Sequence, residues 1–565
     1  MVAIAIDDGQ AEDGKKDPGD KEYKLLEGGS EPKPRWATWK RVLFGVVLVL
    51  FIVVAISLAG YFGNGRGDWF REITEPETLI DCGAIRGAKE GDVFTFRGIP
   101  YALPPVGERR WKPPTPVSQL EDCWTGTLMA LSDKKSCMQK PIHGHPNVTF
   151  DEDCLYVNVY TPTLSPLRKK PVVVYIPGDS LLGLGAPDFA WRPSPQLAHE
   201  RDAVIVTLGY RTNIFGFLAL DVLSRSVHPP TSGNYGLYDI LAALKWVQKN
   251  IPHFGGNPER VTVLAHGSGA TAALMLASSH KSHGLISQLW LSGPSVFVSE
   301  RKAEDVFKDN LVVLQLLNCT SLECLQQKEA ADLLTAIPHH WEETPSLQLP
   351  DSEEVPPAAL AFVDGNMAAE TGVSEASATG DRWNWTEFMS YVTERLDTLD
   401  ANLTESALSL YMSNTSTPLH QFHTMVSDLR SICPVQKLLS LHNHSLADIY
   451  SYVSDFVPSQ PILLAEDLAP VKMPVHGLDI LAIFGLLDSY IPTLADSDRQ
   501  YQRSMQEIFF NFAHHGRPHT DAYALVPHPQ VNLFGSSSPV SKPAPYDHCP
   551  LWFNSGLYPR YAKMN

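Results

Sequence analysis

Basic residues are in short supply in this 565-residue sequence. Lys and Arg number 45 against 63 Asp and Glu, which gives a formal net charge of −18. Binding to nucleic acid requires clustered cations that neutralise phosphates, so this balance argues against a nucleic-acid partner. The acidic excess is interpreted as a contribution to solubility, with electrostatic steering of cationic partners as the alternative. Hydrophobic residues make up 44% of the chain, which excludes wholesale disorder.

Cysteines are few and are missing from the first part of the chain. None of the eight belongs to a CxxC pair with partner histidines, the spacing typical of zinc sites, so the sequence predicts no metal and no cofactor. Thiols gathered in one part of a chain are instead expected to pair in an oxidising compartment, although their spacing alone does not choose the pairs. They are Cys82, Cys123, Cys137, Cys154, Cys319, Cys324, Cys433 and Cys549.

Charge is absent from one long apolar segment, residues 42–62 (VLFGVVLVLFIVVAISLAGYF). As a helix it would be about 30 Å long, which matches the hydrocarbon core of a bilayer. A cleaved signal peptide is the alternative, but the segment starts well inside the chain, exceeds a typical apolar signal region and has no clear small-residue cleavage site nearby. A buried core helix is rarely so uniformly apolar. The segment therefore predicts one transmembrane helix.

The two flanks of this segment differ in basic residues. More of them precede it than follow it, which places the N-terminus in the cytoplasm. Residues 1–41 are rich in Gly, Asp, Glu and Lys and are expected to form a disordered cytoplasmic tail, and residues 63–78 an extracellular linker. The chain is thus predicted to be a single-pass type II protein of the plasma membrane. The basic residues are Lys24, Lys33, Arg35, Lys40 and Arg41 before the segment, and Arg66 and Arg71 after it.

Asn-x-Ser/Thr sequons are likewise missing before the apolar segment, whereas six follow it. Such sequons are acceptors for N-glycosylation in proteins of the secretory route. Their one-sided distribution agrees with an extracellular position for the part of the chain beyond the segment. The six acceptors are Asn147, Asn318, Asn384, Asn402, Asn414 and Asn443.

Strand-like and helix-like runs alternate in the middle of the chain. Residues 171–176 (PVVVYI), 203–208 (AVIVTL) and 260–264 (RVTVL) have the composition of buried strands, and residues 238–250 have helical spacing. The last strand leads directly into HGSGA (residues 266–270) and then into an alanine-rich helical segment. A strand, a tight glycine turn and a helix are the parts of a nucleophile elbow. Parallel strands joined by helices predict an α/β sheet with ligand sites at the strand ends.

Four longer runs carry a resemblance to a known family: FRGIPYALPPVGERRW (96–111), EDCLYVNVYTP (152–162), NYGLYDILAALKWVQKNIPHFGGNPERVTVL (234–264) and VHGLDILAIFG (475–485). They resemble the cholinesterase and type B carboxylesterase family, from about residue 79 to the C-terminus. The resemblance implies one α/β-hydrolase ectodomain of residues 79–565, with a large, mostly parallel sheet flanked by helices, preceded by the transmembrane helix.

The resemblance also implies how the cysteines pair. By motif match, three disulfides are expected, and the two cysteines that are left over are inferred to pair with each other. Each such bridge mainly restricts the unfolded chain. The expected pairs are Cys137 with Cys154, Cys319 with Cys324, Cys433 with Cys549, and Cys82 with Cys123.

Enzymes of this family use a serine at the elbow together with a glutamate and a histidine. Where they typically read VTLFGESAGA, this chain reads VTVLAHGSGA (261–270), so Gly267 occupies the serine position. The adjacent Ser268 does not satisfy GxSxG, and only the apex side chain of an elbow points into the pocket, so Ser268 is interpreted as a small packing residue. By motif match, Glu370 and His476 occupy the other two triad positions and would act as scaffolding.

The oxyanion-hole segment provides a second test. The family's HGGGF aligns with PGDSL (177–181), so Gly178 is kept, while Asp179 and Ser180 replace two glycines. Backbone N–H groups must approach the developing negative charge closely, and an aspartate beside it would repel it. Loss of one donor commonly costs roughly 10²–10³ in rate. Both segments therefore predict that the chain has no catalytic residue and is not an enzyme.

Members of this family without the serine, such as neurotactin, neuroligins and gliotactin, are cell-surface adhesion proteins, and a cytoplasmic N-terminus favours the neurotactin-like arrangement. The resemblance implies a catalytically inactive protein that acts in cell adhesion or ligand recognition and binds an extracellular or cell-surface protein. Two alternatives stay open: a residual carboxylic-ester hydrolase that uses Ser268, and a protein with a small-molecule-binding pocket. The amphipathic segment 496–512 is a candidate homodimer interface, with packing on the domain's own core as the alternative.

Overall fold

The computed structural model divides into two units, and all of the described residues belong to the second, Ile73–Asn565. The predicted cytoplasmic tail and membrane helix lie outside the described residues, and within those residues no helix is both long and apolar enough to cross a bilayer. The described residues are 75–117, 123–140, 148–178, 192–294, 303–338, 341, 361–367, 384–397, 401–412, 417–441, 448–462, 472–535, 540–543 and 548–555.

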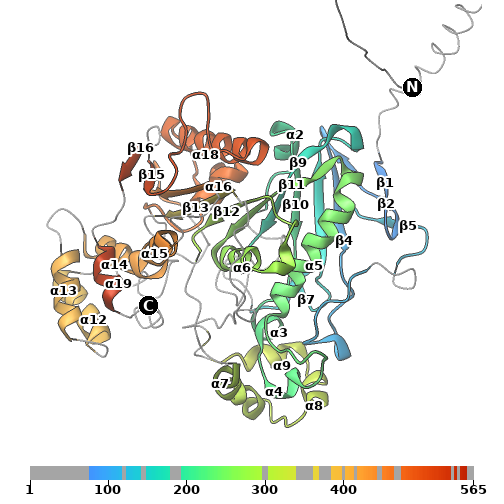
Figure 1. Cartoon of the computed structure of the whole chain (residues 1–565), viewed down its shortest axis with the longest axis horizontal. Coiled ribbons are helices and arrows are strands. Elements are labelled where there is room, and N and C mark those ends of the chain that lie inside the picture. Colours follow the sequence, from blue (N-terminus) through green and yellow to red (C-terminus); the bar gives the residue numbers. More distant parts are fainter. Residues whose placement is uncertain are drawn as a thin grey trace, which may run out of the picture. The chain divides into compact units, whose positions relative to one another are not determined.

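An 11-stranded sheet forms the centre of this unit (Figure 1). The strands from β15 to β10 in the order below are parallel to their neighbours, and the strands beyond them at both edges are antiparallel. The predicted mostly parallel sheet is therefore confirmed. Across the sheet the strands are β16 (Val540–Pro543), β15 (Gln530–Phe534), β14 (Ile449–Ser454), β13 (Ala361–Met367), β12 (Gln288–Ser292), β11 (Gly256–His266), β9 (Lys170–Ile176), β10 (Val204–Leu208), β8 (Tyr156–Thr161), β4 (Val93–Pro100) and β3 (Ala88–Glu90).

The three strands expected from the sequence lie side by side at the centre of the sheet as β9, β10 and β11. Their apolar runs are buried because helices cover both faces of the sheet. Alternate residues of β9 separate the two faces. Val172 and Val174 pack in one core with α5 (Tyr235–Asn250) and α6 (Gly267–Ala277), whereas Val173 and Tyr175 pack in a second core. That second core includes α16 (Leu478–Phe484) and α18 (Asp496–His515).

Helix α18 uses its apolar face inside the domain. Tyr501, Met505, Ile508, Phe509 and Phe512 are all buried, and they belong to the core that also contains α16. The amphipathic pattern of residues 496–512 therefore reflects packing on the domain's own sheet, which was the alternative interpretation.

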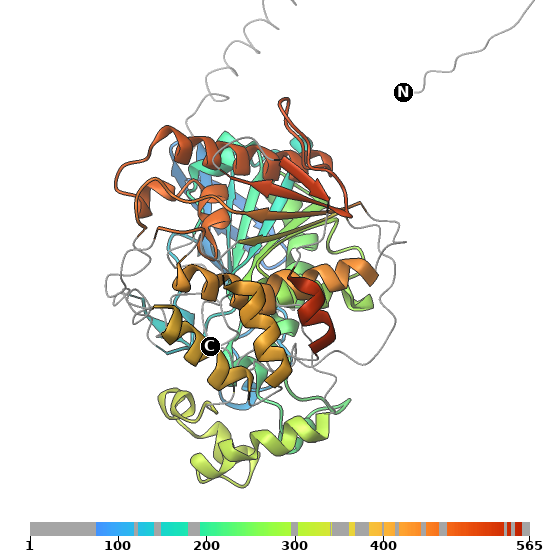
Figure 2. The same ribbon diagram turned by 90° about the vertical axis from the view of Figure 1, so that its left-hand side faces the viewer.

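Two groups of helices lie outside the central layers. In both ribbon views, helices α7 to α9 form a lobe below the sheet (Figures 1 and 2). A second group, centred on α12 to α15, lies at the left of Figure 1, above the level of this lobe. The lobe consists of α7 (Ala303–Leu316), α8 (Leu322–Gln326) and α9 (Ala330–Thr335). The second group consists of α12 (Trp385–Leu396), α13 (Ala401–Tyr411), α14 (Pro418–Ser427), α15 (Cys433–Leu441) and α19 (Cys549–Ser555).

The remaining described elements are short. Two small sheets lie apart from the central one, and four short helices complete the described secondary structure apart from 3-10 and π turns. Because β1 pairs with β2, regular structure begins within the segment that was expected to be a linker. These elements are β1 (Glu77–Ile80), β2 (Gly83–Arg86), β5 (Thr127–Met129), β6 (Ser136–Cys137), β7 (Phe150–Asp151), α2 (Gln196–Glu200), α3 (Asn213–Phe217), α4 (Asp221–Ser224) and α17 (Leu487–Tyr490).

All eight cysteines form disulfides, which comprise the three pairs implied by the family resemblance and the fourth pair inferred from the two cysteines left over. They join segments that are both near and far in sequence, from a separation of 5 residues to one of 116. The longest link connects α15 to α19 and so fixes the C-terminal helix to the second helical group. The pairs are Cys82–Cys123, Cys137–Cys154, Cys319–Cys324 and Cys433–Cys549.

Candidate functional site

The turn between β11 and α6 lies at the carboxyl end of the central strands, where ligand sites are expected in α/β sheets. The strand ends at His266, and the helix begins at Gly267, whose φ is +55°. Residues other than glycine rarely adopt this backbone conformation without strain. The structure thus has the strand, turn and helix of an elbow, with Gly267 at the bend.

Ser268 follows the bend and lies in the first turn of α6. It is 8% exposed. A Cβ atom placed on Gly178 would lie 2.6 Å from Ser268 Oγ and 2.3 Å from the backbone nitrogen of Gly269. The hydroxyl of Ser268 therefore packs against the backbone that follows β9, beneath the turn, and position 178 admits only glycine.

The backbone that follows β9 is held from a second side by Tyr210. The fully buried Tyr210 hydroxyl donates to the Pro177 carbonyl oxygen at 2.7 Å, and burial raises the pKa of this phenol above its usual range. Tyr210 is consequently a neutral hydrogen-bond donor at physiological pH. Of the oxyanion-segment positions singled out in the sequence, Gly178 lies next to the elbow, while Asp179 and Ser180 lie outside the described residues.

Two imidazole rings meet beside the elbow. The ring centroids of His266 and His476 are 4.3 Å apart, and the ring planes are inclined by 39°. His266 is the last residue of β11, whereas His476 immediately precedes the turn into α16. Burial lowers the pKa of His266 well below its usual range, His476 lowers it further, and a hydrogen bond with the Gly178 backbone opposes the shift. His266 is therefore neutral at physiological pH.

The sequence identified His476 as a triad position but gave His266 no role of its own. The missed signal was its place directly before the bend, because the last residue of a central strand points towards the same end of the sheet as the turn. The third triad position, Glu370, lies outside the described residues. The structure places the ring of His476 against that of His266, the residue directly before Gly267 and Ser268.

A buried carboxylate supports the segment that carries His476. Tyr452 donates to Asp479 Oδ2 at 2.7 Å, and the backbone N–H of Ile480 donates to Asp479 Oδ1 at 2.9 Å. Trp290 Nε1 donates to the Tyr452 hydroxyl at 3.2 Å and ties this network to β12. Burial raises the pKa of Tyr452, and the charge of Asp479 raises it further. The network fixes the start of α16 and with it the position of His476.

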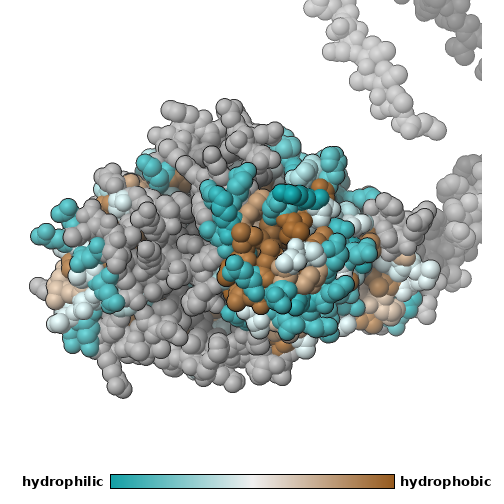
Figure 3. Space-filling model, turned by 90° about the horizontal axis from the view of Figure 1, so that it is seen from below, coloured by the Kyte–Doolittle hydropathy of each residue, from teal (hydrophilic) through white to brown (hydrophobic). Residues whose placement is uncertain are grey.

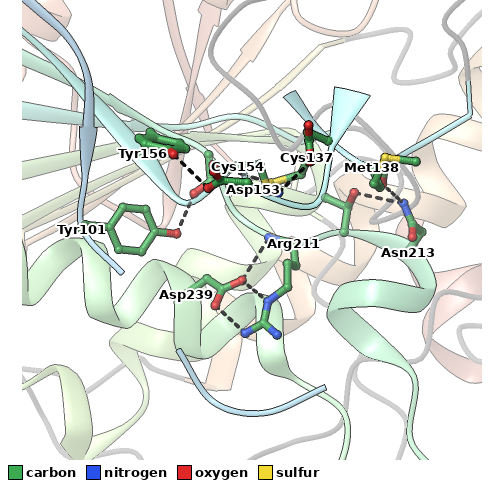
Figure 4. The surroundings of a disulfide bond; sticks show 12 residues. Tyr101, Cys137, Met138, Asp153, Cys154, Tyr156, Arg211, Asn213 and Asp239 are labelled. Carbon is green, nitrogen blue, oxygen red and sulfur yellow. Dashed lines mark hydrogen bonds and ion pairs between the residues drawn. A yellow bond between two sulfur atoms is a disulfide. The ribbon is translucent and has the colours of Figure 1, made fainter. Parts of the chain in front are cut away.

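A buried ion pair fixes the segment that follows β10. Arg211 Nε and Nη2 donate to the two carboxylate oxygens of Asp239 at 2.7 Å each, and the Arg211 backbone N–H donates at 3.0 Å (Figure 4). Both side chains are almost completely buried. Because Arg211 directly follows Tyr210, this pair also fixes the phenol that contacts Pro177. Figure 4 shows it near the Cys137–Cys154 disulfide.

The described part of the chain does not gather three or more His, Cys, Asp or Glu side chains in a geometry that could hold a metal ion. The elbow offers two imidazoles in mutual contact, Ser268 packed beneath the turn, and glycine at the bend.

Of the six predicted glycosylation acceptors, Asn318, Asn384 and Asn402 are exposed. The other three, Asn147, Asn414 and Asn443, lie outside the described residues.

A model of the carboxylesterase family matches residues 74–356 and 358–537. The chain belongs to the carboxylesterase family. It is similar to neurotactin of Drosophila melanogaster, with 30% identity over 553 residues, which cover 93% of this chain and 62% of neurotactin. It is also similar to para-nitrobenzyl esterase of Bacillus subtilis, with 30% identity over 80% of this chain and 92% of that protein.

Solved structures of carboxylesterases share the fold of this chain. A thermophilic PNB esterase covers 84% of the chain at a TM-score of 0.68 and 26% identity, and 99% of that structure is matched. The resemblance drawn from the sequence motifs, including the neurotactin-like subgroup, is therefore confirmed, as is the α/β-hydrolase fold. The chain spans 62% of the length of neurotactin.

Proposed function

We propose that this chain is a catalytically inactive, cholinesterase-like cell-surface protein that recognises an extracellular or cell-surface protein ligand in cell adhesion. The observation that carries the proposal is the glycine at the bend of the elbow, with φ of +55° at Gly267. Acyl transfer needs a nucleophile whose oxygen projects from this apex towards a general base. Glycine supplies none.

The position of Ser268 argues against compensation by the neighbouring residue. A nucleophile must reach the substrate carbonyl, yet the Ser268 hydroxyl is enclosed between the first turn of α6 and the backbone at Gly178. Its release would require the oxyanion segment to move away from the elbow. That segment carries Asp179, whose negative charge opposes the charge that develops on a substrate oxygen.

The paired histidines fit a structural role better than a catalytic one. A general base in this family takes its proton from the serine at the apex, and His476 instead contacts the ring of His266. His266 stands where the family sequences have the glutamate before the serine. The contact between the two rings contributes to packing between β11 and the start of α16, and the glycine at the apex leaves His476 without a hydroxyl to activate.

A cell-surface location is part of the proposal. The apolar segment 42–62 would anchor the chain as a single-pass type II protein, and the exposure of Asn318, Asn384 and Asn402 is compatible with glycosylation of an outward-facing domain. Similarity to neurotactin over most of the chain supports a recognition role. Several similar proteins are named as esterases, so hydrolysis is the outcome that the test must exclude.

The test compares the full chain with its Ser268→Ala variant. Both are incubated with a chromogenic p-nitrophenyl ester and, separately, with a fluorescent organophosphate that labels active serine hydrolases. We expect no turnover above buffer and no labelling of either protein. Turnover that Ser268→Ala abolishes would overturn the proposal. A cell-surface pull-down with the full chain then identifies the ligand, and a protein retained by the chain after salt washes supports recognition.

A further inference from the structure

Helix α7 presents apolar side chains to solvent. Its inner face buries Val306, Asn310 and Val313, but Leu311 is 47% exposed and Leu316 is 60% exposed. They are five residues apart, about 140° around the helix axis, so they lie on the two sides of the outer face of α7. Seen from below, apolar side chains gather over the lobe that α7 forms with α8 and α9 (Figure 3). Exposed apolar surface of this kind marks a place where another group can bind.

A predicted glycosylation acceptor stands at the end of this helix. The backbone N–H of Asn318 donates to the Gln315 carbonyl at 3.1 Å, and that of Cys319 donates to the Leu314 carbonyl at 2.9 Å. Asn318 has φ of +49°, the left-handed conformation that commonly ends a helix. Cys319 is buried and bonded to Cys324. Asn318 is therefore held firmly, with its exposed side chain two residues beyond Leu316.

We propose that an N-glycan on Asn318 lies back along α7 and covers Leu311 and Leu316. Sugar rings carry apolar C–H faces, and burying these faces against leucine side chains removes apolar surface from water. The inference rests on the proposed extracellular position of the domain, because only that position exposes Asn318 to glycosylation. It also assigns the α7 face to the chain's own glycan, so the protein ligand binds elsewhere on the domain.

The other exposed acceptors provide an internal comparison. Asn402 lies in the first turn of α13, and none of the exposed large hydrophobic side chains lies within that helix. Asn384 caps α12 by accepting hydrogen bonds from the N–H groups of Thr386 and Glu387. A glycan on Asn402 should therefore extend into solvent, without apolar surface along its helix to cover.

The experiment uses two substitutions of Thr320, the third residue of the sequon. Thr320 is exposed, so neither is expected to disturb the fold. Thr320→Ala destroys the sequon but keeps Asn318, whereas Thr320→Ser preserves the sequon. The full chain and both variants are produced in animal cells, glycan occupancy is measured by glycopeptide mass spectrometry, and exposed side chains are labelled with a photoactivated carbene.

We expect Asn318 to be occupied in the wild type and in Thr320→Ser, and labelling of the α7 peptide to rise by about twofold or more in Thr320→Ala. Asn402→Gln should leave α7 labelling unchanged, and the Cys319–Cys324 disulfide should persist in every variant.

If Asn384 or Asn402 carries a glycan and Asn318 does not, the inference about α7 is overturned while the proposed function is not. The absence of glycans from all three acceptors also removes the support for an outward-facing domain. Unchanged labelling in Thr320→Ala, or protection of α7 that depends on protein concentration, overturns the glycan as the cover.

Discussion

The imidazole rings of His266 and His476 are in contact across the elbow, with ring centroids 4.3 Å apart. One ring ends the strand that leads into the bend, and the other precedes α16, so their contact joins two distant parts of the chain at the position of a family catalytic site. Burial and the neighbouring His476 both lower the pKa of His266, so the His266 ring is neutral in this contact at physiological pH.

This contact predicts a loss of stability in acid. The folded pKa of His266 is lower than the usual value of 6.5, so the unfolded chain binds a proton first as the pH falls. The contribution of neutral His266 is fully present above about pH 6.5 and decreases below it. In chemical denaturation at pH 7.5 and pH 5.5, the free energy of unfolding should fall more for the wild type than for His266→Gln. Equal decreases would contradict this prediction.

A second buried histidine gives a quantitative version of the same test. Burial lowers the pKa of His423 in α14 to about 4, and the nearby His420 lowers it further. A depression of this size corresponds to about 3 kcal/mol of stability, which is present above pH 6.5 and is lost as the pH falls to about 4. The stability difference between the wild type and His423→Gln should shrink by about this amount between pH 7 and pH 4. His283→Gln, at an exposed position outside α14, serves as the control and should change the free energy of unfolding little at either pH.

Restoring the apex serine should not restore an enzyme. In Gly267→Ser the hydroxyl would occupy the family position on the strained turn, where φ is +55°. Asp179 and Ser180 would still replace two oxyanion-hole glycines. Hydrolysis of p-nitrophenyl acetate by Gly267→Ser should stay at the level of Gly267→Ala. Turnover well above that control would show that the oxyanion segment is functional.

Breaking the Arg211–Asp239 pair should destabilise the domain strongly. Asp239→Asn leaves the Arg211 charge without its bidentate partner in a buried site, and such losses commonly cost about 3–5 kcal/mol. The decrease is measured by urea denaturation monitored by tryptophan fluorescence. The matched control is Asp221→Asn, which breaks the exposed pair with Arg225 and should change stability little. A small effect of Asp239→Asn would mean that water replaces the lost contacts.

Local patterns in the sequence predicted much of the scaffold. Strands β9 and β10 could be predicted from their apolar, β-branched runs, and helix α5 from the spacing of its apolar residues. Each of these patterns depends on the element's own residues and on their burial. Family motifs supplied three of the disulfide pairs, which spacing alone left open, and the fourth followed from the two cysteines left over. The pattern of α18 was also correct as an amphipathic helix, but its amphipathic character did not say which surface it meets. The structure packs it against the sheet beside α16.

By itself, the sequence determined the family, the parallel α/β sheet and the glycine at the bend of the elbow, because each of these can be recognised from a run of consecutive residues. Tertiary structure alone decided that Ser268 packs against Gly178, that His266 meets His476, and that Arg211 pairs with Asp239 next to Tyr210. These contacts join residues on different elements. Their distances and pKa shifts depend on how the elements pack and exclude water, which no local pattern encodes.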